Sequence, residues 1–482
     1  MSLDDILLYI EQSNEIIQYP ENDLFAPSER YPEYEYNVIS SEYNGVYEMI
    51  RNAFHGMGLD DENFGTAVWN PLGDVIKPGD KVVLKPNLVK NYDDPRQYEC
   101  TLTHPSVIRA VLDYVVKAKP QSIVLGDAPI QGADLNAIAN VLKLNEIIDF
   151  YRQKGVDIEF IDFRDLIVKT VKHINVVAKE KNPDSDEFVT VHLGKNSKHY
   201  EDAFDGKYGV IDYDEEQINE FHDGERHDYI VSKYIIEADV IINLPKPKTH
   251  RYAGLTAAQK NFVGACSDKE TLPHFKAGST CVGGDETNNN SILSRLIRKF
   301  YRIYQRKAKQ KKLHTARFIF YIYAVLLRLQ GKKFYLHGAW YGNDTIWRTI
   351  IDLNKIVLYA DKNGIYSDDS VKRKIFTIGD MIICGEKEGP LWPSPKRMNM
   401  VMMSNNLAAF DYSFCRIMGF DEEIIPTVHH SIRNTKLSCE DWQNILIRSN
   451  NKKLDNHRIS DFPREEEWNF IPHSYWKGVL KK

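Results

Sequence analysis

Short apolar runs alternate with longer amphipathic segments along most of the chain. Runs rich in Val, Ile and Leu predict buried strands, and apolar residues that recur every three or four positions predict helices. Strands are expected at residues 80–85, 122–126, 156–161, 235–244, 355–359, 375–384 and 398–403. Helices are expected at residues 43–57, 105–119, 134–151 and 408–418. This alternation predicts an α/β fold with a mainly parallel sheet and helices on both faces.

Several segments depart from this alternation, and they suggest how the chain is divided. A charge-rich stretch at about 170–230 predicts a small β-rich insertion in the core. We therefore expect, in order, an N-terminal arm (1–38), an α/β core with that insertion (39–287), a basic helical pair (288–335), a continuation of the core (336–435) and a C-terminal extension (436–482).

The predicted helical pair is strongly basic. From Asn288 to Asn343 there is no Asp or Glu, but there are 13 Lys or Arg. Residues 316–327 are apolar on all sides, yet 12 residues of helix reach only about 18 Å, short of the roughly 30 Å hydrocarbon core of a bilayer. Residues 295–333 are thus expected to pack against the body, to contact an anionic membrane surface or to bind another polyanion.

The overall composition excludes several functional classes. Lys and Arg total 62 against 68 Asp and Glu, a net charge of −6, so no specific nucleic-acid binding is expected. The six cysteines are scattered without a C-x-x-C pair, which argues against a disulfide framework or a zinc ribbon. No signal-peptide pattern opens the sequence, and we expect a cytoplasmic protein. The common nucleotide-binding, zinc-protease and serine-hydrolase motifs are absent from the sequence.

Polar residues stand at the ends of the first predicted strands. Lys85 and Asn87 follow one strand, Asp127 ends the next, and His104 opens the helix at 105–119. Ligands collect beyond the carboxyl ends of parallel strands, so Lys85, His104 and Asp127, together with His250 further along the chain, are expected to converge on one pocket. We predict that Lys85 and Asn87 bind substrate and that His104 and Asp127 act in catalysis. The structural alternatives are a surface lysine, a helix cap and an Asx-turn.

The densest cluster of candidate residues follows the predicted strand at 235–244. Residues 245–264 contain no acidic residue, and two prolines stiffen their first part. This pattern predicts an anion-binding site. Its expected substrate-binding residues are Lys246, Lys248, Lys260 and Asn261, and His250 is expected to transfer protons.

Carboxylates follow downstream of the basic segment. Glu386 and Glu388 lie in a glycine-bounded loop after a predicted strand. Together with Asp127 they are candidate ligands for Mg²⁺ beside a phosphorylated ligand, or candidate groups for acid–base chemistry. Asp344 and Arg348 stand four residues apart, a spacing that also fits a helical salt bridge.

Several of these motifs resemble the domain-of-unknown-function family numbered 362, over about residues 40–430. The residues that carry the resemblance are Val82–Leu88, Thr103–Pro105, Gly126–Asp127, Pro245–His250, Lys260–Gly264, Gly342–Thr349, Asp352–Asn354 and Gly385–Pro390. Many relatives carry cysteine runs for iron–sulfur clusters, but this chain has none, so no such cluster is expected. The resemblance implies a site but no agreed activity.

A weaker likeness is to the nickel-pincer lactate racemase group. Two histidines exchange a substrate proton in that group, which would assign such a role to His104 and His250 here. The signature segments of that group are missing from the chain.

Three functions follow from these observations. The first is a cytoplasmic enzyme acting on a phosphorylated or carboxylated small molecule through a Lys/His/Asp pocket. The second is a non-catalytic binding or scaffold protein at an anionic membrane surface. The third is isomerase- or racemase-like proton transfer by two histidines. The reaction class stays open between metal-assisted transfer and isomerisation.

Overall fold

The computed structural model describes residues 6–171, 174–182, 187–202, 204, 206–210, 215–310, 312–330 and 335–480. Its helices are α1 (Gly45–Gly56), α2 (Pro95–Thr101), α3 (Pro105–Lys117), α4 (Leu135–Val141), α5 (Leu144–Gln153), α6 (Glu215–Phe221), α7 (Lys233–Glu237), α8 (Ala258–Asn261), α9 (Ile292–Lys309), α10 (Leu313–Gln330), α11 (Ile346–Tyr359), α12 (Leu407–Ile417) and α13 (Pro426–Ile432).

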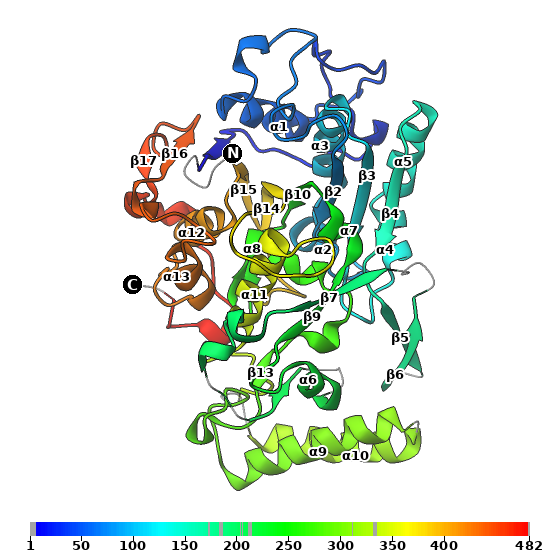
Figure 1. Ribbon diagram of the computed structural model, residues 1–482, viewed down its shortest axis with the longest axis vertical. Helices are drawn as coiled ribbons and strands as arrows, with labels where there is room; N and C mark the ends of the chain where they lie inside the picture. Colours follow the sequence, from blue (N-terminus) through cyan, green and yellow to red (C-terminus); the bar gives the residue numbers. More distant parts are fainter. Residues whose placement is uncertain are drawn as a thin grey trace.

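A large mixed sheet runs through the centre of the molecule (Figure 1). Its strands are β1 (Leu8–Gln12), β2 (Lys81–Pro86), β3 (Ser122–Asp127), β4 (Ile158–Asp162), β10 (Val240–Leu244), β11 (Lys248–His250), β12 (Gly254–Thr256), β14 (Lys374–Glu386), β15 (Ser394–Ser404), β16 (Leu446–Ser449) and β17 (His457–Arg458). The strand order is β17-β16-β1-β15-β14-β10-β2-β3-β4, and β11 pairs with both β12 and β14.

The half of the sheet that matters for the site is parallel. Strands β14, β10, β2, β3 and β4 all run in one direction, with Ile241 opposite Val83 and Val83 opposite Val124. Their carboxyl ends therefore meet at one edge of the sheet. The prediction of a mainly parallel sheet is confirmed.

Helices cover both faces of the sheet, as the sequence predicts. In β2, Val82 and Leu84 belong to a core that includes residues of α1, α3, α4 and α5. The alternate residue Val83 belongs to a second core that includes residues of α11, α12 and α13. Side chains of a strand point alternately to the two faces, so the near-continuous apolar character of β2 reflects burial on both sides.

The two ends of the chain contribute strands to the same sheet. Within the predicted N-terminal arm, β1 lies between β15 and β16, with Leu8 opposite both Ser404 and Ile447. Strands β16 and β17 come from the predicted C-terminal extension. Pairing partners as far apart in the sequence as Leu8 and Ser404 cannot be read from a local pattern. The domain boundaries themselves stay predictions.

Three local predictions were wrong. Residues 355–359 are the last part of helix α11, not a strand. Ile346, Ile350 and Leu353 precede them at helical spacing, so the whole segment forms one amphipathic helix. The helix expected at 134–151 is two helices, which are separated at Lys143 by a left-handed backbone with φ 53°. The run at 235–244 begins as α7, and the strand starts only at Val240.

The β-rich insertion and the basic helical pair are both confirmed. The insertion contains β5 (Leu166–Val171), β6 (Ile174–Lys181), β7 (Phe188–His192), β8 (Tyr208–Gly209) and β9 (Asp228–Ser232), and β13 (Phe275–Lys276) pairs with β8. Helices α9 and α10 form a hairpin at the lower end of the molecule (Figure 1). Lys332 and Lys333, part of the predicted basic segment, lie outside the described residues.

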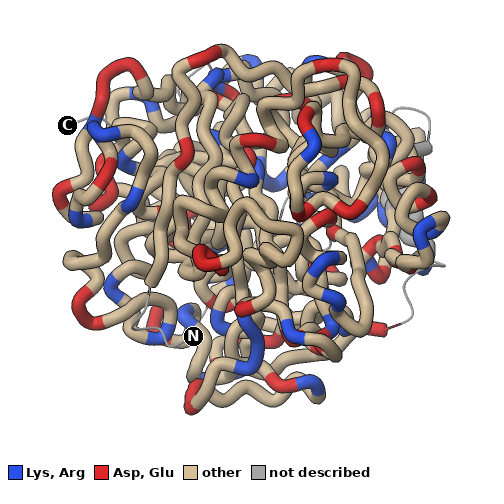
Figure 2. Tube along the Cα trace, turned by 90° about the horizontal axis from the view of Figure 1, so that it is seen from above, with Lys and Arg blue, Asp and Glu red and all other residues tan. Residues whose placement is uncertain are grey.

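Seen from above, Lys and Arg are interspersed with Asp and Glu (Figure 2).

The position of β1 predicts that its apolar residues contribute to stability. Ile10 is fully buried in β1, whereas Ile16 is 68% exposed only six residues later. We expect Ile10→Ala to lower the free energy of unfolding by about 2–5 kcal/mol, because it leaves a cavity in the core. Ile16→Ala is the matched control and should change that free energy by less than about 0.5 kcal/mol. Urea denaturation measures both, and equal small effects would show that the arm is not part of the sheet.

Candidate functional site

A cavity of about 390 Å³ opens at the carboxyl ends of β2 and β3. Six residues predicted from the sequence line it, namely Asn87, Asp127, Lys248, His250, Lys260 and Asn261. Side chains that the sequence analysis did not single out line it as well, among them Lys90, Arg251, Tyr252, Thr256, Lys269 and His274. The parallel strands thus bring together most of the predicted site.

A buried salt bridge forms the floor of this region. The Lys85 ammonium lies 2.6 Å from Asp127 Oδ1, and both side chains are almost completely buried. The backbone N–H groups of Leu88 and Ala128 also donate to the Asp127 carboxylate, at 2.7 and 2.9 Å. Asp127 is therefore held by one cation and two backbone donors, and Lys85 lies behind it rather than in the cavity lining.

Gly264 allows the chain to approach this salt bridge closely. A Cβ atom at position 264 would lie 2.0 Å from Asp127 Oδ1 and 2.6 Å from the Lys85 ammonium. The Gly264 carbonyl accepts a 2.9 Å hydrogen bond from the Ala128 N–H. The predicted motif Lys260–Gly264 thus includes a glycine because no side chain fits there.

Hydrogen bonds between asparagine side chains connect Lys248 to the ends of β2 and β10. The Lys248 ammonium donates to Asn87 Oδ1 at 2.8 Å and to the Thr101 carbonyl at 2.8 Å. The Asn87 amide donates to Asn261, whose own amide donates to the Lys85 carbonyl and to Asn243. All the acceptors around Lys248 are neutral, and burial together with nearby Lys246 lowers the pKa of Lys248 to about 7.

Lys260 differs from the other lysines of the site. Burial, with the nearby charges of Lys269 and Arg251, lowers the pKa of Lys260 to about 7. Lys85 and Lys248 have close acceptors, but within the described part of the chain the Lys260 ammonium meets neither a hydrogen-bond acceptor nor a carboxylate. Lys269 donates to the Val263 carbonyl at 2.6 Å, and burial lowers its pKa to about 8.

The two histidines of the cavity are held in opposite tautomers. Nδ1 of His250 accepts hydrogen bonds from the N–H groups of Tyr252 and Ala253, at 3.0 and 3.1 Å. The neutral His250 ring must then carry its proton on Nε2. Nδ1 of His274 lies 2.8 Å from the Leu272 carbonyl, which can only accept, so this ring carries its proton on Nδ1 and leaves Nε2 as an acceptor.

Both histidines are neutral near pH 7. Burial lowers the pKa of His274 to about 4, although its bond to Leu272 acts in the opposite direction. Burial also holds the pKa of His250 well below its usual value, and Lys260 and Arg251 act in the same direction. At neutral pH the cavity therefore has one imidazole with a donor at Nε2 and one with an acceptor at Nε2.

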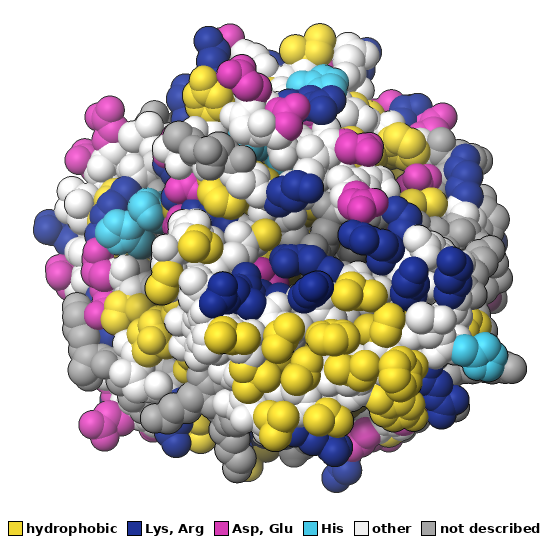
Figure 3. All heavy atoms as spheres, turned by 90° about the horizontal axis from the view of Figure 1, so that it is seen from below, with side chains coloured by type: hydrophobic (Ala, Val, Ile, Leu, Met, Phe, Trp, Pro, Cys, Tyr) yellow, Lys and Arg dark blue, Asp and Glu magenta, His cyan; other side chains and the backbone are white. Residues whose placement is uncertain are grey.

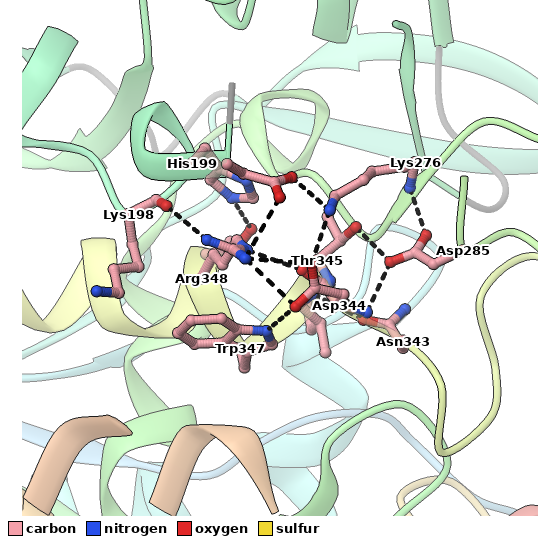
Figure 4. A network of polar contacts seen from close by, with 12 residues as sticks. Lys198, His199, Lys276, Asp285, Asn343, Asp344, Thr345, Trp347 and Arg348 are labelled. Atoms are coloured by element: carbon pink, nitrogen blue, oxygen red, sulfur yellow. Dashed lines mark hydrogen bonds and ion pairs between the residues drawn. The ribbon is translucent and has the colours of Figure 1, made fainter. Parts of the chain in front are cut away.

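Figure 4 shows a polar network that includes Lys276, Asn343, Asp344 and Arg348. This network also holds the segment that carries His274. The Asn343 amide donates to the His274 carbonyl at 2.7 Å, and the Thr349 hydroxyl donates to the Pro273 carbonyl at 2.8 Å. Lys276 forms a 2.7 Å ion pair with Asp344, which also binds Arg348 at 3.1 Å. The predicted salt bridge between Asp344 and Arg348 is present. Neither residue lines the cavity, and the pair supports the surrounding structure.

His104 and Lys246 belong to a separate buried cluster. The Lys246 ammonium lies 3.0 Å from Asp380 and 2.6 Å from the Tyr19 hydroxyl. The His104 ring stacks on Tyr19 with centroids 3.9 Å apart, and its backbone N–H donates to Asp380 at 2.8 Å. His104 also caps α3, since its Nδ1 accepts from the Ser106 N–H. Neither residue lines the cavity, so the structure does not bring all the predicted residues together, and their functional roles stay predictions.

Glu386 and Glu388 also lie apart from Asp127. Glu386 accepts from the Ile471 N–H at 2.8 Å, and Glu388 contacts Ser474 and His473 at 3.1 Å each. Among the described residues, no three His, Cys, Asp or Glu side chains are grouped as a metal site. The predicted Mg²⁺ ligands are not assembled here, and a metal role remains a prediction.

Sequence reasoning missed Lys269 and His274 for a simple reason. Lys269 stands between Asp268 and Glu270, which resembles an ordinary mixed-charge surface, and His274 lies outside every strand-end motif. Both residues lie within 14 positions after Lys260, which belongs to the acid-free segment 245–264. This closeness was the one signal in the sequence that could have added them to the predicted site.

Comparisons with known proteins found partial similarity to a curated protein and to a solved structure. A thylakoid-associated protein of Synechocystis sp. is 27% identical over 208 residues, which cover 43% of this chain and 46% of that protein. The match thus spans less than half of the relative's length. A crystal structure of a protein from Thermotoga maritima aligns with 13% identity and a TM-score of 0.29, over 73% of this chain and 54% of that one.

A family model matches two stretches that together make up more than half of the sequence. It matches residues 82–183 and 195–416, which include all the cavity residues named above. With well over half of its residues matched, the chain belongs to the family described as Domain of unknown function (DUF362).

Proposed function

We propose that the cavity binds an anionic small molecule, phosphorylated or carboxylated, and that the protein is an enzyme that acts on it by proton transfer. The observation that carries the proposal is the Lys260 ammonium, which has no acceptor in the described structure. Lys260 is only partly exposed, and an anionic ligand in the cavity would supply the partner that its ammonium lacks.

The balance of charge in the lining supports an anion over a cation. Lys90, Lys248, Arg251, Lys260 and Lys269 line the cavity. Asp127 is the one carboxylate among the lining residues, and Lys85 together with two backbone N–H groups already neutralises it. A cation in this cavity would meet repulsion without a free carboxylate to offset it.

The histidines suit the proposed chemistry. His250 Nε2–H can donate a hydrogen bond to an anionic or carbonyl oxygen of the ligand, and His274 Nε2 can accept a proton from it. A two-histidine exchange, inferred above from the lactate racemase likeness, would need one ring to be protonated, so the proposed step is removal and return of a ligand proton by His274, with neutral His250 as hydrogen-bond donor. His274 takes the place of His104 in it, because His104 does not reach the cavity.

Substitution of Lys260 tests the binding step. Inorganic phosphate, pyrophosphate and citrate serve as probes in isothermal titration calorimetry. We expect at least one of them to bind, and Lys260→Met to weaken its binding about 10-fold or more, since a charge-assisted hydrogen bond contributes about 1.5–3 kcal/mol. Lys362→Met, at an exposed lysine, is the matched control and should bind like the wild type. The proposal fails if no probe binds, or if the two variants bind equally well.

The pH dependence of binding provides an independent test. Sulfate is the probe, because its charge is constant between pH 6 and pH 8. The Lys260 pKa of about 7 means that the ammonium is charged below pH 7 and loses its proton above it. Sulfate affinity should therefore fall as pH rises through 7, by up to about tenfold per pH unit. Lys260→Arg keeps its charge throughout and should bind with a flatter profile. Wild-type affinity that stays constant or rises with pH would contradict the assignment.

A further inference from the structure

The outer helix of the basic hairpin presents an exposed apolar stripe. Phe318, Tyr321, Val325 and Leu329 are 66%, 55%, 54% and 70% exposed. At 100° per residue these positions fall on one side of α10. Only Ala316 and Ile319 of this helix are buried, and they pack on Tyr301, Tyr304 and Ala308 of α9. The apolar stripe of α10 is therefore left uncovered by the described part of the chain.

Basic side chains border this stripe. Figure 3 shows a row of Lys and Arg along one edge of a continuous apolar band at the lower end of the molecule. Arg317 and Arg328 are exposed and lie on the same flank of the α10 stripe, and Arg295, Lys299 and Arg306 are exposed on α9. No acidic residue occurs anywhere in the sequence of the hairpin.

The hairpin is held firmly against the body. Glu286, which is nearly completely buried, forms ion pairs with Arg298 at 3.4 Å and with Arg302 at 3.0 Å. The Tyr301 ring lies 4.1 Å from the His337 ring, measured between centroids. These contacts use two arginines as structural anchors and leave the remaining basic side chains on the surface.

We propose that α9 and α10 dock the protein on the surface of an anionic lipid bilayer, with the α10 stripe in the headgroup region and the flanking arginines on lipid phosphates. An apolar stripe beside a cationic border matches an interface where acyl chains lie beneath negative headgroups. A second copy of the chain fits less well, because a self-paired contact would set one basic border against another. Among the described residues, no helix is long and apolar enough to cross a bilayer, so the contact is interfacial.

Vesicle co-sedimentation of the full-length chain tests the proposal. We expect binding to vesicles of phosphatidylcholine with phosphatidylglycerol, much weaker binding to phosphatidylcholine alone, and loss of binding at high salt. The double variant Phe318→Gln/Leu329→Gln should lower the partition coefficient about tenfold or more, since it removes apolar area from the stripe. Arg317→Gln/Arg328→Gln should weaken binding to the anionic vesicles specifically.

The matched control removes exposed apolar side chains elsewhere. Val68 and Ile365 are 67% and 63% exposed, so Val68→Gln/Ile365→Gln changes a similar apolar area outside the hairpin and should bind like the wild type. Circular dichroism confirms that each variant is folded. The proposal is overturned if the folded wild-type chain binds neither vesicle, or if the hairpin and control variants bind alike. Dimerisation that is abolished by the α10 variant would assign the stripe to a second copy and would also overturn it.

Discussion

The buried salt bridge between Lys85 and Asp127 is the constraint on which the site depends. It joins the carboxyl ends of β2 and β3, and Gly264 is present because a side chain would collide with it. Removing one partner of such a pair leaves an uncompensated buried charge, a loss of about 3–5 kcal/mol. The pair also occupies the one carboxylate of the cavity lining, so the positive charges around the cavity have no free counterion among the lining residues.

The chemistry of the cavity follows from that charge imbalance. Burial among neighbouring cations lowers the pKa values of Lys248 and Lys260 to about 7, far below the ordinary lysine range. The same positive surroundings help to keep His250 and His274 neutral. Backbone hydrogen bonds then fix their tautomers in opposite senses, which creates one donor and one acceptor. A positive cavity with neutral imidazoles suits an anion that exchanges a proton.

Sequence reasoning predicted the parts of the fold and the site that depend on local pattern. Asn87, Asp127, Lys248 and His250 share the cavity because parallel strands place their carboxyl ends at one edge. The position of β1 between β15 and β16 was not predictable, since its pairing partners are distant in the sequence.

His104 and Lys246 were assigned to the cavity for a related reason. Both follow the strand-end pattern, but Asp380 of β14 and Tyr19 of the N-terminal segment hold them in a separate buried cluster. The motifs show which polar residues lie near the carboxyl edge of the sheet. The side chains that these residues contact are set by strands and segments that come together only in the folded sheet.

The most direct test of the central claim is a crystal structure of the protein soaked in selenate, whose anomalous signal locates the anion. We expect a selenate in the cavity with an oxygen at hydrogen-bonding distance, about 2.7–3.2 Å, from the Lys260 ammonium and a second contact to His250 Nε2. Anomalous peaks confined to surface lysines, with no anion in the cavity, would contradict the account.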